Sequence, residues 1–382
     1  MKRPPPLRTD GSNAFARHSM QERVPRIARD VLDRNRDYSS GVRGAVERLA
    51  RDIESDAPLR APRPPAPDVT EWTAAHAEHA GETWLGTEWF HAELAFYREL
   101  VHACRFWETG RDPFATQKEE ELSGERPWSR LETVAARGEA KREERISTLL
   151  EACLWGNRVD LSYAVAASRA DGEDGDLLVD ERTAALPLLT HRGARVHVIA
   201  DNAGTELALD LALIAALLEE PATRVTIHVK MQPTFVSDAM ACDVWQLLAH
   251  MRARGGAFRA LVECLDECFR AGRLELVPDP FWTAPRFLWQ APAHVRESFA
   301  SATIVVLKGD ANYRRLIGDA LWPPTTPLAE ACAYFPSPVV CLRTMKSDPI
   351  VGLPAALAER LDTSHSGWRV DGKRGVVQTV VR

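Results

Sequence analysis

The sequence contains no C-x-x-C pair and no run of the roughly 20 apolar residues that a membrane-spanning helix needs. The first absence leaves a zinc ribbon or a thioredoxin-like redox site without support. The seven cysteines are odd in number and scattered through mostly apolar segments, as expected of reduced packing residues in a cytoplasmic protein. The N-terminus is basic but lacks an apolar stretch, so we expect neither a secretory signal nor a membrane segment.

The sequence also has no excess of positive charge, because its 54 Asp and Glu residues outnumber its 48 Lys and Arg residues. The formal net charge is −6, so we expect no basic face able to neutralise the phosphates of a nucleic acid. A local basic pocket for one small anion is compatible with that charge. The sequence also lacks a P-loop, a GxSxG nucleophile elbow and an HExxH zinc motif, which argues against three common classes of enzyme.

The first part of the chain has helical periodicity and almost no strand signal. Apolar residues recur at helical spacing in residues 21–35, and residues 86–107 form an aromatic-rich segment typical of a buried helix. Residues 140–166 predict another helix, ending near Gly156, and the proline-rich residues 57–72 predict an extended surface connection. We therefore predict a helical N-terminal region over residues 1–175.

The remainder, residues 176–382, alternates between strand-like and helix-like segments. Short apolar runs occupy residues 195–200, 224–230, 274–277, 303–307 and 339–342. Helical stretches lie at residues 205–220, 238–254, 257–271 and 293–300. This alternation predicts an α/β domain with a mostly parallel sheet covered by helices on both faces, which is a three-layer α/β/α arrangement.

Polar clusters follow four of the predicted strands. In chain order they are Asp201-Asn202, then Ser237-Asp238, then the segment Lys308 to Arg314, and finally Arg343, Thr344 and Lys346. In open parallel sheets, ligands bind in the crevice at the carboxyl ends of the strands. We therefore predict that the four clusters meet at one site.

The chemistry of these clusters is that of phosphoryl transfer. Asp201, Asn202 and Asp238 offer hard oxygen donors, which suit Mg²⁺ or Mn²⁺ better than zinc. Cationic side chains able to bind phosphate oxygens come from Lys308, Arg314, Arg343 and Lys346. A divalent cation beside a group of basic side chains is what phosphate-ester hydrolysis requires.

Each cluster also has a purely structural interpretation. Asp201-Asn202 before a glycine is typical of a turn with a helix cap, and Asp238 could cap the next helix. Glu206 could face the site or only interact with its helix N-terminus.

Several other polar side chains lie in apolar surroundings. We interpret His197 and His228 as sheet residues rather than ligands, and Glu93 and Tyr97 as residues of a mainly packing helix that could reach the crevice.

The ordered motifs resemble a known family. "DNAGTELALDLALIAALL", "PTFVSD", "KGDANYR" and "CLRTMKSDPIVGL" are similar to the damage-control phosphatases, also called domain of unknown function 89. The RTxK signature resembles the acidic-residue-methyltransferase-like subfamily in particular. Further similarity lies upstream, in "ARHSMQERVPRIARDVL", "WFHAELAFYREL" and "CLWGNRVDLS", so the resemblance covers nearly the whole chain.

The resemblance implies a helical region joined to a Rossmann-like α/β/α domain, and a metal-dependent phosphatase of small phosphorylated metabolites such as fructose phosphates. It implies that Asp201, Asn202 and Asp238 bind the divalent metal, which would be Mn²⁺, Co²⁺, Ni²⁺ or Mg²⁺. We predict catalytic roles for Asp201, Asp310 and Lys346. The predicted substrate-binding residues are Asn202, Glu206, Lys308, Asp310, Asn312, Arg314, Arg343 and Lys346. Ala203, Thr205 and Ala311 depart from the family pattern, which bears on substrate preference rather than catalysis.

Three questions stay open at this point. Water could attack phosphorus directly, or a carboxylate such as Asp201 or Asp310 could first form a phospho-enzyme. A methyltransferase that uses S-adenosylmethionine is the alternative reaction, although "ADNAGTE" supplies only one of the glycines that such a fold normally needs. A non-catalytic sugar-phosphate-binding protein is the third alternative. The sequence specifies no oligomeric state.

Overall fold

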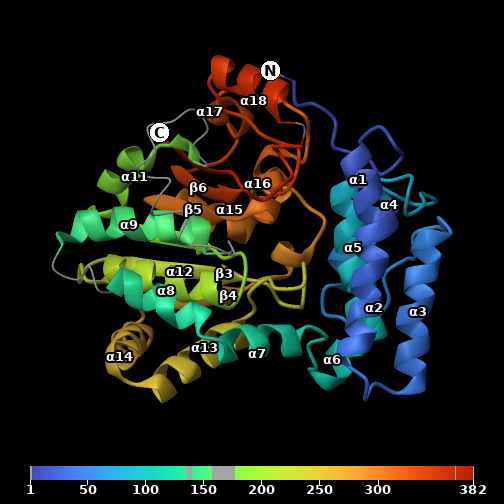
Figure 1. Cartoon of the computed structure of the whole chain (residues 1–382), viewed down its shortest axis with the longest axis horizontal. Coiled ribbons are helices and arrows are strands. Elements are labelled where there is room, and N and C mark those ends of the chain that lie inside the picture. Colours follow the sequence, from blue (N-terminus) through green and yellow to red (C-terminus); the bar gives the residue numbers. More distant parts are fainter. Residues whose placement is uncertain (1, 136–139, 157–176, 366, 382) are drawn as a thin grey trace.

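The computed structural model describes residues 2–135, 140–156, 177–365 and 367–381. It has two parts, shown in Figure 1: a group of helices from the N-terminal region on one side, and a sheet with its covering helices on the other. The predicted mixed α/β architecture with a mostly parallel sheet is confirmed.

The N-terminal region is helical, as predicted. Its elements are α1 (Ala14–His18), η1 (Ser19–Arg23), α2 (Val24–Arg34), α3 (Ser40–Glu54), α4 (Val69–Ala77), α5 (Trp89–Ala103), α6 (Phe106–Thr109), α7 (Ala115–Ser123), α8 (Arg126–Ala135) and α9 (Arg142–Trp155). Helix α2 buries Val24, Val31 and Leu32 at helical spacing, whereas α5 is buried on nearly every side. The proline-rich connection contains no helix up to Asp68 but has turns at residues 64–65 and 67–68, and α4 begins at Val69.

The sheet has seven strands among the described residues. They are β1 (Leu177–Asp180), β2 (Arg195–Ile199), β3 (Arg224–Val229), β4 (Leu274–Pro278), β5 (Ile304–Lys308), β6 (Val339–Thr344) and β7 (Gly375–Val380), in the spatial order β1-β7-β6-β5-β2-β3-β4. The five strands from β6 to β4 are mutually parallel, and β7 is antiparallel to β6. Strands β1 and β7 were not predicted. The order makes β6, β5, β2 and β3 direct neighbours, so their carboxyl ends share one edge.

Helices cover both faces of the sheet because the central strands are apolar on both faces. Val196 and Val198 of β2 pack into one cluster, whereas Ile199 packs into the opposite one. The first layer contains α8, α9, α11 (Arg182–Leu189), α12 (Thr205–Leu218), α13 (Ala241–Arg254) and α14 (Gly256–Arg270). The second contains η2 (Pro280–Thr283), η3 (Leu288–Gln290), α15 (Ala293–Ala300), α16 (Asp310–Ile317), α17 (Leu328–Ala331) and α18 (Ala355–Ser364).

A separate hydrophobic cluster, from Leu7 to Phe114, holds the N-terminal helices together. Phe235 and Val236, from the loop after β3, pack against this cluster and connect it to the sheet. Helices α8 and α9 instead pack on the sheet, although both precede residue 175. The division at residue 175 stays a prediction.

No helix in the described ranges is both long and apolar enough to cross a membrane. All seven cysteines are free thiols, and five of them are buried.

A carboxylate from the N-terminal region caps α12, the helix that follows β2. Glu121 Oε1 of α7 accepts hydrogen bonds from the backbone N of Thr205 at 2.9 Å and from its Oγ1 at 2.6 Å. Gly204, with φ of 68°, admits this carboxylate, since a Cβ there would lie 2.3 Å from Glu121 Oε2. The contact fixes the start of α12 directly beside Asp201 and Asn202.

We expect Glu121→Gln to lower the free energy of unfolding by about 1 kcal/mol, because a neutral amide is a poorer cap for the helix N-terminus than a carboxylate. Urea unfolding followed by circular dichroism measures the change. The matched control is Glu120→Gln, which removes only an exposed ion pair with Arg34 and should change stability by less than about 0.5 kcal/mol. Equal effects of the two substitutions would contradict the assigned cap.

Candidate active site

The loops after β2 and β3 are held together by a short antiparallel bridge. Asn202 pairs with Asp238, flanked by backbone hydrogen bonds from Ala203 N to Ser237 O at 2.7 Å and from Ala239 N to Asp201 O at 2.8 Å. This pattern makes Asn202 and Asp238 a non-hydrogen-bonded pair, the kind in which opposite side chains approach most closely. The first two predicted polar clusters therefore meet.

The carboxylate of Asp201 lies against the backbone of the loop after β5. A Cβ at Gly309 would be 2.1 Å from Asp201 Cγ, so this position, with φ of 84°, accepts only glycine. Gly309 N donates to Leu342 O of β6 at 2.9 Å. The close approach connects the ends of β2, β5 and β6.

These strand ends border a cavity of about 620 Å³. Its lining includes six of the predicted site residues: Asp201, Asn202, Asp238, Asp310, Arg314 and Lys346. The N-terminal helices supply another side of the cavity through Phe15, Arg23, Trp89 and Glu93, and the segment before β7 supplies Val370, Asp371 and Gly372. The convergence predicted from four strand ends is therefore present in the structure.

Acidic side chains are concentrated where the metal ligands are predicted. Burial and the carboxylates of Glu206 and Asp238 raise the pKa of Asp201 well above its usual value, although Lys346 and Lys308 oppose the shift. Burial raises the pKa of Asp238 to about 6, although Lys230 opposes that shift. Asp238 Oδ2 lies 3.3 Å from Lys230 Nζ, yet it accepts no hydrogen bond from the described residues.

The amide of Asn202 connects these acids. Its Nδ2 donates to Asp201 Oδ2 at 2.8 Å and to Glu206 Oε2 at 2.9 Å, while its Oδ1 accepts from Ser237 Oγ at 2.6 Å. Within the described ranges, no group of three or more His, Cys, Asp and Glu side chains is arranged to hold a metal ion. The predicted ligand set contains only two such side chains, Asp201 and Asp238, with the amide oxygen of Asn202 as its third member.

Asp310 begins α16 and is held by the RTxK segment. Its Oδ1 accepts from Arg343 Nε at 2.8 Å and from Lys346 N at 3.1 Å. Burial alone would raise the pKa of Asp310, but Arg343 and Arg314 hold it below its usual value, so the side chain is ionised. Arg343 is fully buried and also binds Ser347 O at 2.9 Å, so it positions Asp310 rather than reaching the cavity. The Lys346 side chain is exposed and lines the cavity.

Lys308 lies below the site and not in it. Its buried Nζ donates to Glu206 Oε1 at 2.7 Å, Asp210 Oδ1 at 2.8 Å and Cys153 O at 3.0 Å. Burial would lower the pKa of Lys308, but the charges of Asp210 and Glu206 raise it overall, so the ammonium stays charged. The structure therefore gives no geometric support for direct phosphate contact by Lys308, and Glu206 likewise does not line the cavity.

The two remaining predicted residues differ in exposure to the cavity. Asn312 Nδ2 donates to Ala200 O at 3.1 Å and to Lys308 O at 2.8 Å, so it joins the ends of β2 and β5 and is not part of the lining. Arg314 does line the cavity, with its guanidinium stacked 3.7 Å above the ring centroid of Trp89. Its Nε and Nη2 bind Asp319, and its Nη1 binds Glu93 Oε2 at 2.7 Å.

Sequence reasoning missed the contribution of Arg23 and understated that of Glu93. Glu93 is buried, lines the cavity and bridges Arg23 and Arg314. Arg23 falls within the motif "ARHSMQERVPRIARDVL", but nothing in the sequence places that helix beside β5. Tyr97 is enclosed in the core and packs on Phe235, which agrees with its packing role.

Two further expectations concern other parts of the chain. His197 Nδ1 and His228 Nε2 lie 2.9 Å apart, so these histidines pair with each other inside the sheet layer. The segment Asn157–Ser162 of the motif "CLWGNRVDLS" lies outside the described residues.

The fold and site define a class of protein: an α/β/α protein with a Rossmann-like sheet and a ligand cavity at the carboxyl ends of adjacent parallel strands. The family model described as "Damage-control phosphatase ARMT1-like domain" matches residues 19–361. The chain belongs to this family, which confirms the resemblance read from its motifs.

Individual relatives agree with this assignment. Proteins named damage-control phosphatase ARMT1 include one from Xenopus laevis, 29% identical over 78% of this chain and 76% of the relative. One from Danio rerio is 28% identical over 98% of this chain and 96% of the relative, and one from Homo sapiens is 24% identical over 96% of each. The crystal structure of a DUF89 family protein from Pyrococcus horikoshii matches with a TM-score of 0.52 and 15% identity, covering 96% of this chain and 98% of that one. At that identity, the last comparison shows the fold alone.

We expect Lys308→Met to lower the free energy of unfolding by roughly 3–5 kcal/mol, because it leaves the buried carboxylates of Glu206 and Asp210 without their cation. Chemical denaturation of the two proteins measures the difference. The control combines Lys308→Met with Glu206→Gln and Asp210→Asn, which removes the unpaired charges and should recover much of the loss. A loss below about 1 kcal/mol in the single variant would show that the ion network is not structural.

Proposed function

We propose that the protein is a metal-dependent phosphatase that hydrolyses phosphate monoesters of small metabolites. The observation that carries the proposal is the single cavity at the ends of β6, β5, β2 and β3, lined by Asp201, Asp238 and Asp310 together with Lys346 and Arg314. The relatives named damage-control phosphatases support the same activity.

The side chains present fit a divalent metal. Asp201, Asn202 and Asp238 present only oxygen donors, and burial together with the neighbouring acids makes two adjacent carboxylates costly to ionise. Asp238 Oδ2 also lacks a hydrogen-bond donor among the described residues. A hard dication would relieve that excess of negative charge, which favours Mn²⁺, Co²⁺, Ni²⁺ or Mg²⁺ over zinc. When bound, it would polarise the phosphoryl group and offset its charge.

The other residues have distinct roles in this proposal. Lys346 places an exposed ammonium at the cavity, where it would neutralise the phosphoryl oxygens. Arg314 uses three of its five N–H donors on Asp319 and Glu93, which leaves two for the phosphate. Asp310 is kept ionised by Arg343, so it would serve as a nucleophile or proton acceptor and not as a proton donor.

We further propose that the substrates are sugar phosphates, such as fructose phosphates. The cavity volume of about 620 Å³ falls in the range of sites for small organic ligands and exceeds what a phosphate ion alone would need. Away from the phosphate-binding side chains, the lining combines aromatic residues with carboxylates, through Phe15, Trp89 and Asp371. Such a lining can stack on a sugar ring and accept hydrogen bonds from its hydroxyls.

The first test is phosphate release from p-nitrophenyl phosphate and from hexose phosphates, with and without Mn²⁺ or Co²⁺. We expect metal-dependent hydrolysis that Asp201→Ala lowers at least a hundredfold, because a central metal ligand is lost. The matched control is Asp348→Ala, a half-buried acid that follows the RTxK segment and does not line the cavity. We expect this control to keep most of the activity.

Three outcomes would contradict the proposal. Equal rates for the wild type and Asp201→Ala would refute the site assignment. Binding of S-adenosylmethionine, measured by calorimetry in a protein without metal-dependent hydrolysis, would favour a methyltransferase. Tight binding of a sugar phosphate without turnover at any metal concentration would favour a non-catalytic binding protein.

The second test does not require activity. We expect Mn²⁺ at about 100 times its dissociation constant to stabilise the folded protein by about 2.7 kcal/mol, seen as a rise in the thermal unfolding midpoint. Asp238→Asn should abolish most of this rise, because one anionic ligand is lost. The unfolding midpoint of the metal-free variant measures separately the cost of leaving the buried Lys230 without its ion pair. The baseline is the thermal unfolding midpoint measured in Mg²⁺-free buffer that contains a chelator. A rise of the same size in Asp238→Asn would exclude this residue as a ligand.

A further inference from the structure

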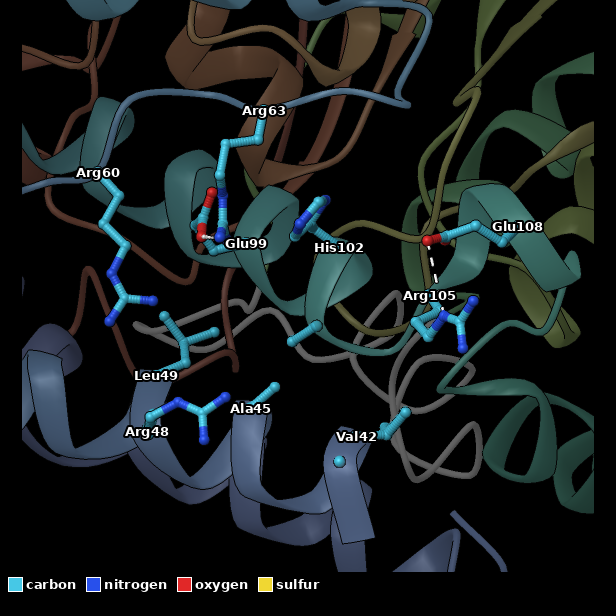
Figure 2. Close-up of a pocket in the computed structure, with 12 residues that line it drawn as sticks. Val42, Ala45, Arg48, Leu49, Arg60, Arg63, Glu99, His102, Arg105 and Glu108 are labelled. Atoms are coloured by element: carbon cyan, nitrogen blue, oxygen red, sulfur yellow. Dashed lines mark hydrogen bonds and ion pairs between the residues drawn. The ribbon is translucent and has the colours of Figure 1, made fainter. Parts of the chain in front are cut away.

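The helical N-terminal region contains a second hollow, with a volume of about 280 Å³, between α3 and α5 (Figure 2). It exists because small residues face each other across the two helices: Gly41 and Ala45 on α3, and Ala103 at the end of α5. Val42 and Leu49, from the same face of α3, add an apolar surface. None of the carboxylates of the candidate active site lines this hollow.

Four arginines from three separate elements line the hollow. They are Arg48 on α3, Arg60 and Arg63 on the proline-rich segment, and Arg105 after α5. Glu99 and Glu108 in the lining, and Asp52, which pairs with Arg60 from outside it, offset three of these four charges, so a surplus of one positive charge remains. That surplus stands out because the chain as a whole has a net charge of −6.

Not all four arginines form close ion pairs with carboxylates. Arg48 is exposed and has no carboxylate within ion-pair distance in the described part of the chain. Arg105 Nε lies 3.6 Å from Glu108 Oε1, and Arg105 remains 61% exposed, so this pair is loose. Figure 2 shows the guanidinium groups of Arg48 and Arg60 on the same side of the hollow. An anion there would replace water as the partner of Arg48.

Arg60 and Arg63 are held in place by ion pairs and by a stiff backbone. Arg63 Nη2 donates to the buried Glu99 at 3.0 Å, and Arg60 pairs with Asp52. Nearby prolines fix φ along the segment, and Leu59 N donates to Glu82 O at 2.9 Å. Side chains ordered before binding lose less entropy when a ligand arrives.

We propose that this hollow is a second binding site, for a small phosphorylated molecule that carries a dianionic phosphate group. Guanidinium forks match phosphate oxygens in geometry, and Arg48, which has no ion-pair partner among the described residues, supplies a positive charge for a phosphate monoester. The volume leaves space for a short organic part beyond the phosphate, against Val42 and Leu49.

Helix α5 gives this site a connection to the cavity. Trp89 and Glu93 line the cavity, while Glu99 and His102, further along the same helix, line the hollow.

Phenylglyoxal labelling tests the location directly, with inorganic phosphate as the probe. We expect phosphate to slow the modification of Arg48 and Arg60 at least threefold, as measured by mass spectrometry of peptides. Arg26 is exposed on α2 and lines neither site, so its modification should be unaffected. Equal protection of all exposed arginines, or none at Arg48, would overturn the proposal.

Calorimetry on variants tests the affinity separately from catalysis. Lys346→Ala serves as the background, because it weakens phosphate binding in the cavity and leaves the hollow intact. In that background we expect Arg48→Gln to raise the phosphate dissociation constant about tenfold, and Arg26→Gln to leave it unchanged. Unchanged affinity in Arg48→Gln, or no measurable binding in the background protein, would overturn the second site. Neither result depends on whether the cavity hydrolyses phosphate esters.

Discussion

The fold around the cavity depends on one buried ammonium group. Lys308 Nζ donates to three oxygens, those of Glu206 and Asp210 on α12 and the backbone oxygen of Cys153 on α9. It lies beneath the acids at the end of β2. Without that cation, two carboxylates of α12 would face each other in a medium of low dielectric, where unpaired charges are strongly destabilising. Because Glu206 also accepts from Asn202, the same ion network fixes the amide that connects the predicted metal ligands. The same ion network therefore contributes both to the stability of the fold and to the geometry of the site.

Two backbone features bring the acids to the position that Lys308 supports. The short bridge between Asn202 and Asp238 turns the loop after β3 back toward β2. Gly309 removes the side chain that would otherwise occupy the space of the Asp201 carboxylate. Both features act at strand ends and not within the sheet, so the sheet itself can remain regular and apolar. Because the polar groups lie at the strand ends and the apolar side chains lie within the sheet, a strongly charged site can adjoin a hydrophobic core.

The sequence was sufficient to predict the sheet, its covering helices and the meeting of polar strand ends, because strand periodicity and the crevice rule for parallel sheets depend on local pattern and topology. It could not separate cations that face the cavity from cations that support it. Lys308 and Arg343 follow predicted strands just as Lys346 does, yet in the structure the first two lie within β5 and β6, enclosed and paired with acids. That difference depends on which way each side chain points, because successive side chains along a strand point to opposite faces of the sheet. The role of Arg23 could not be predicted for another reason. Its place in the cavity depends on how α5 and η1 pack against the part of the protein that contains the sheet.

The distribution of charge explains why the chain's own residues are not enough for a complete anion site. Arg343 is committed to Asp310, Lys308 to Glu206 and Asp210, and Arg314 mostly to Asp319 and Glu93. Lys346 is thus the least engaged of the predicted cations, while burial raises the pKa of both Asp201 and Asp238 at the same mouth. In the proposed function, a bound divalent cation would favour the ionised form of these two acids and would offset the charge of the phosphate. The same acids would hold that cation, so the proposed phosphatase would need the metal both for its own carboxylates and for the phosphate dianion.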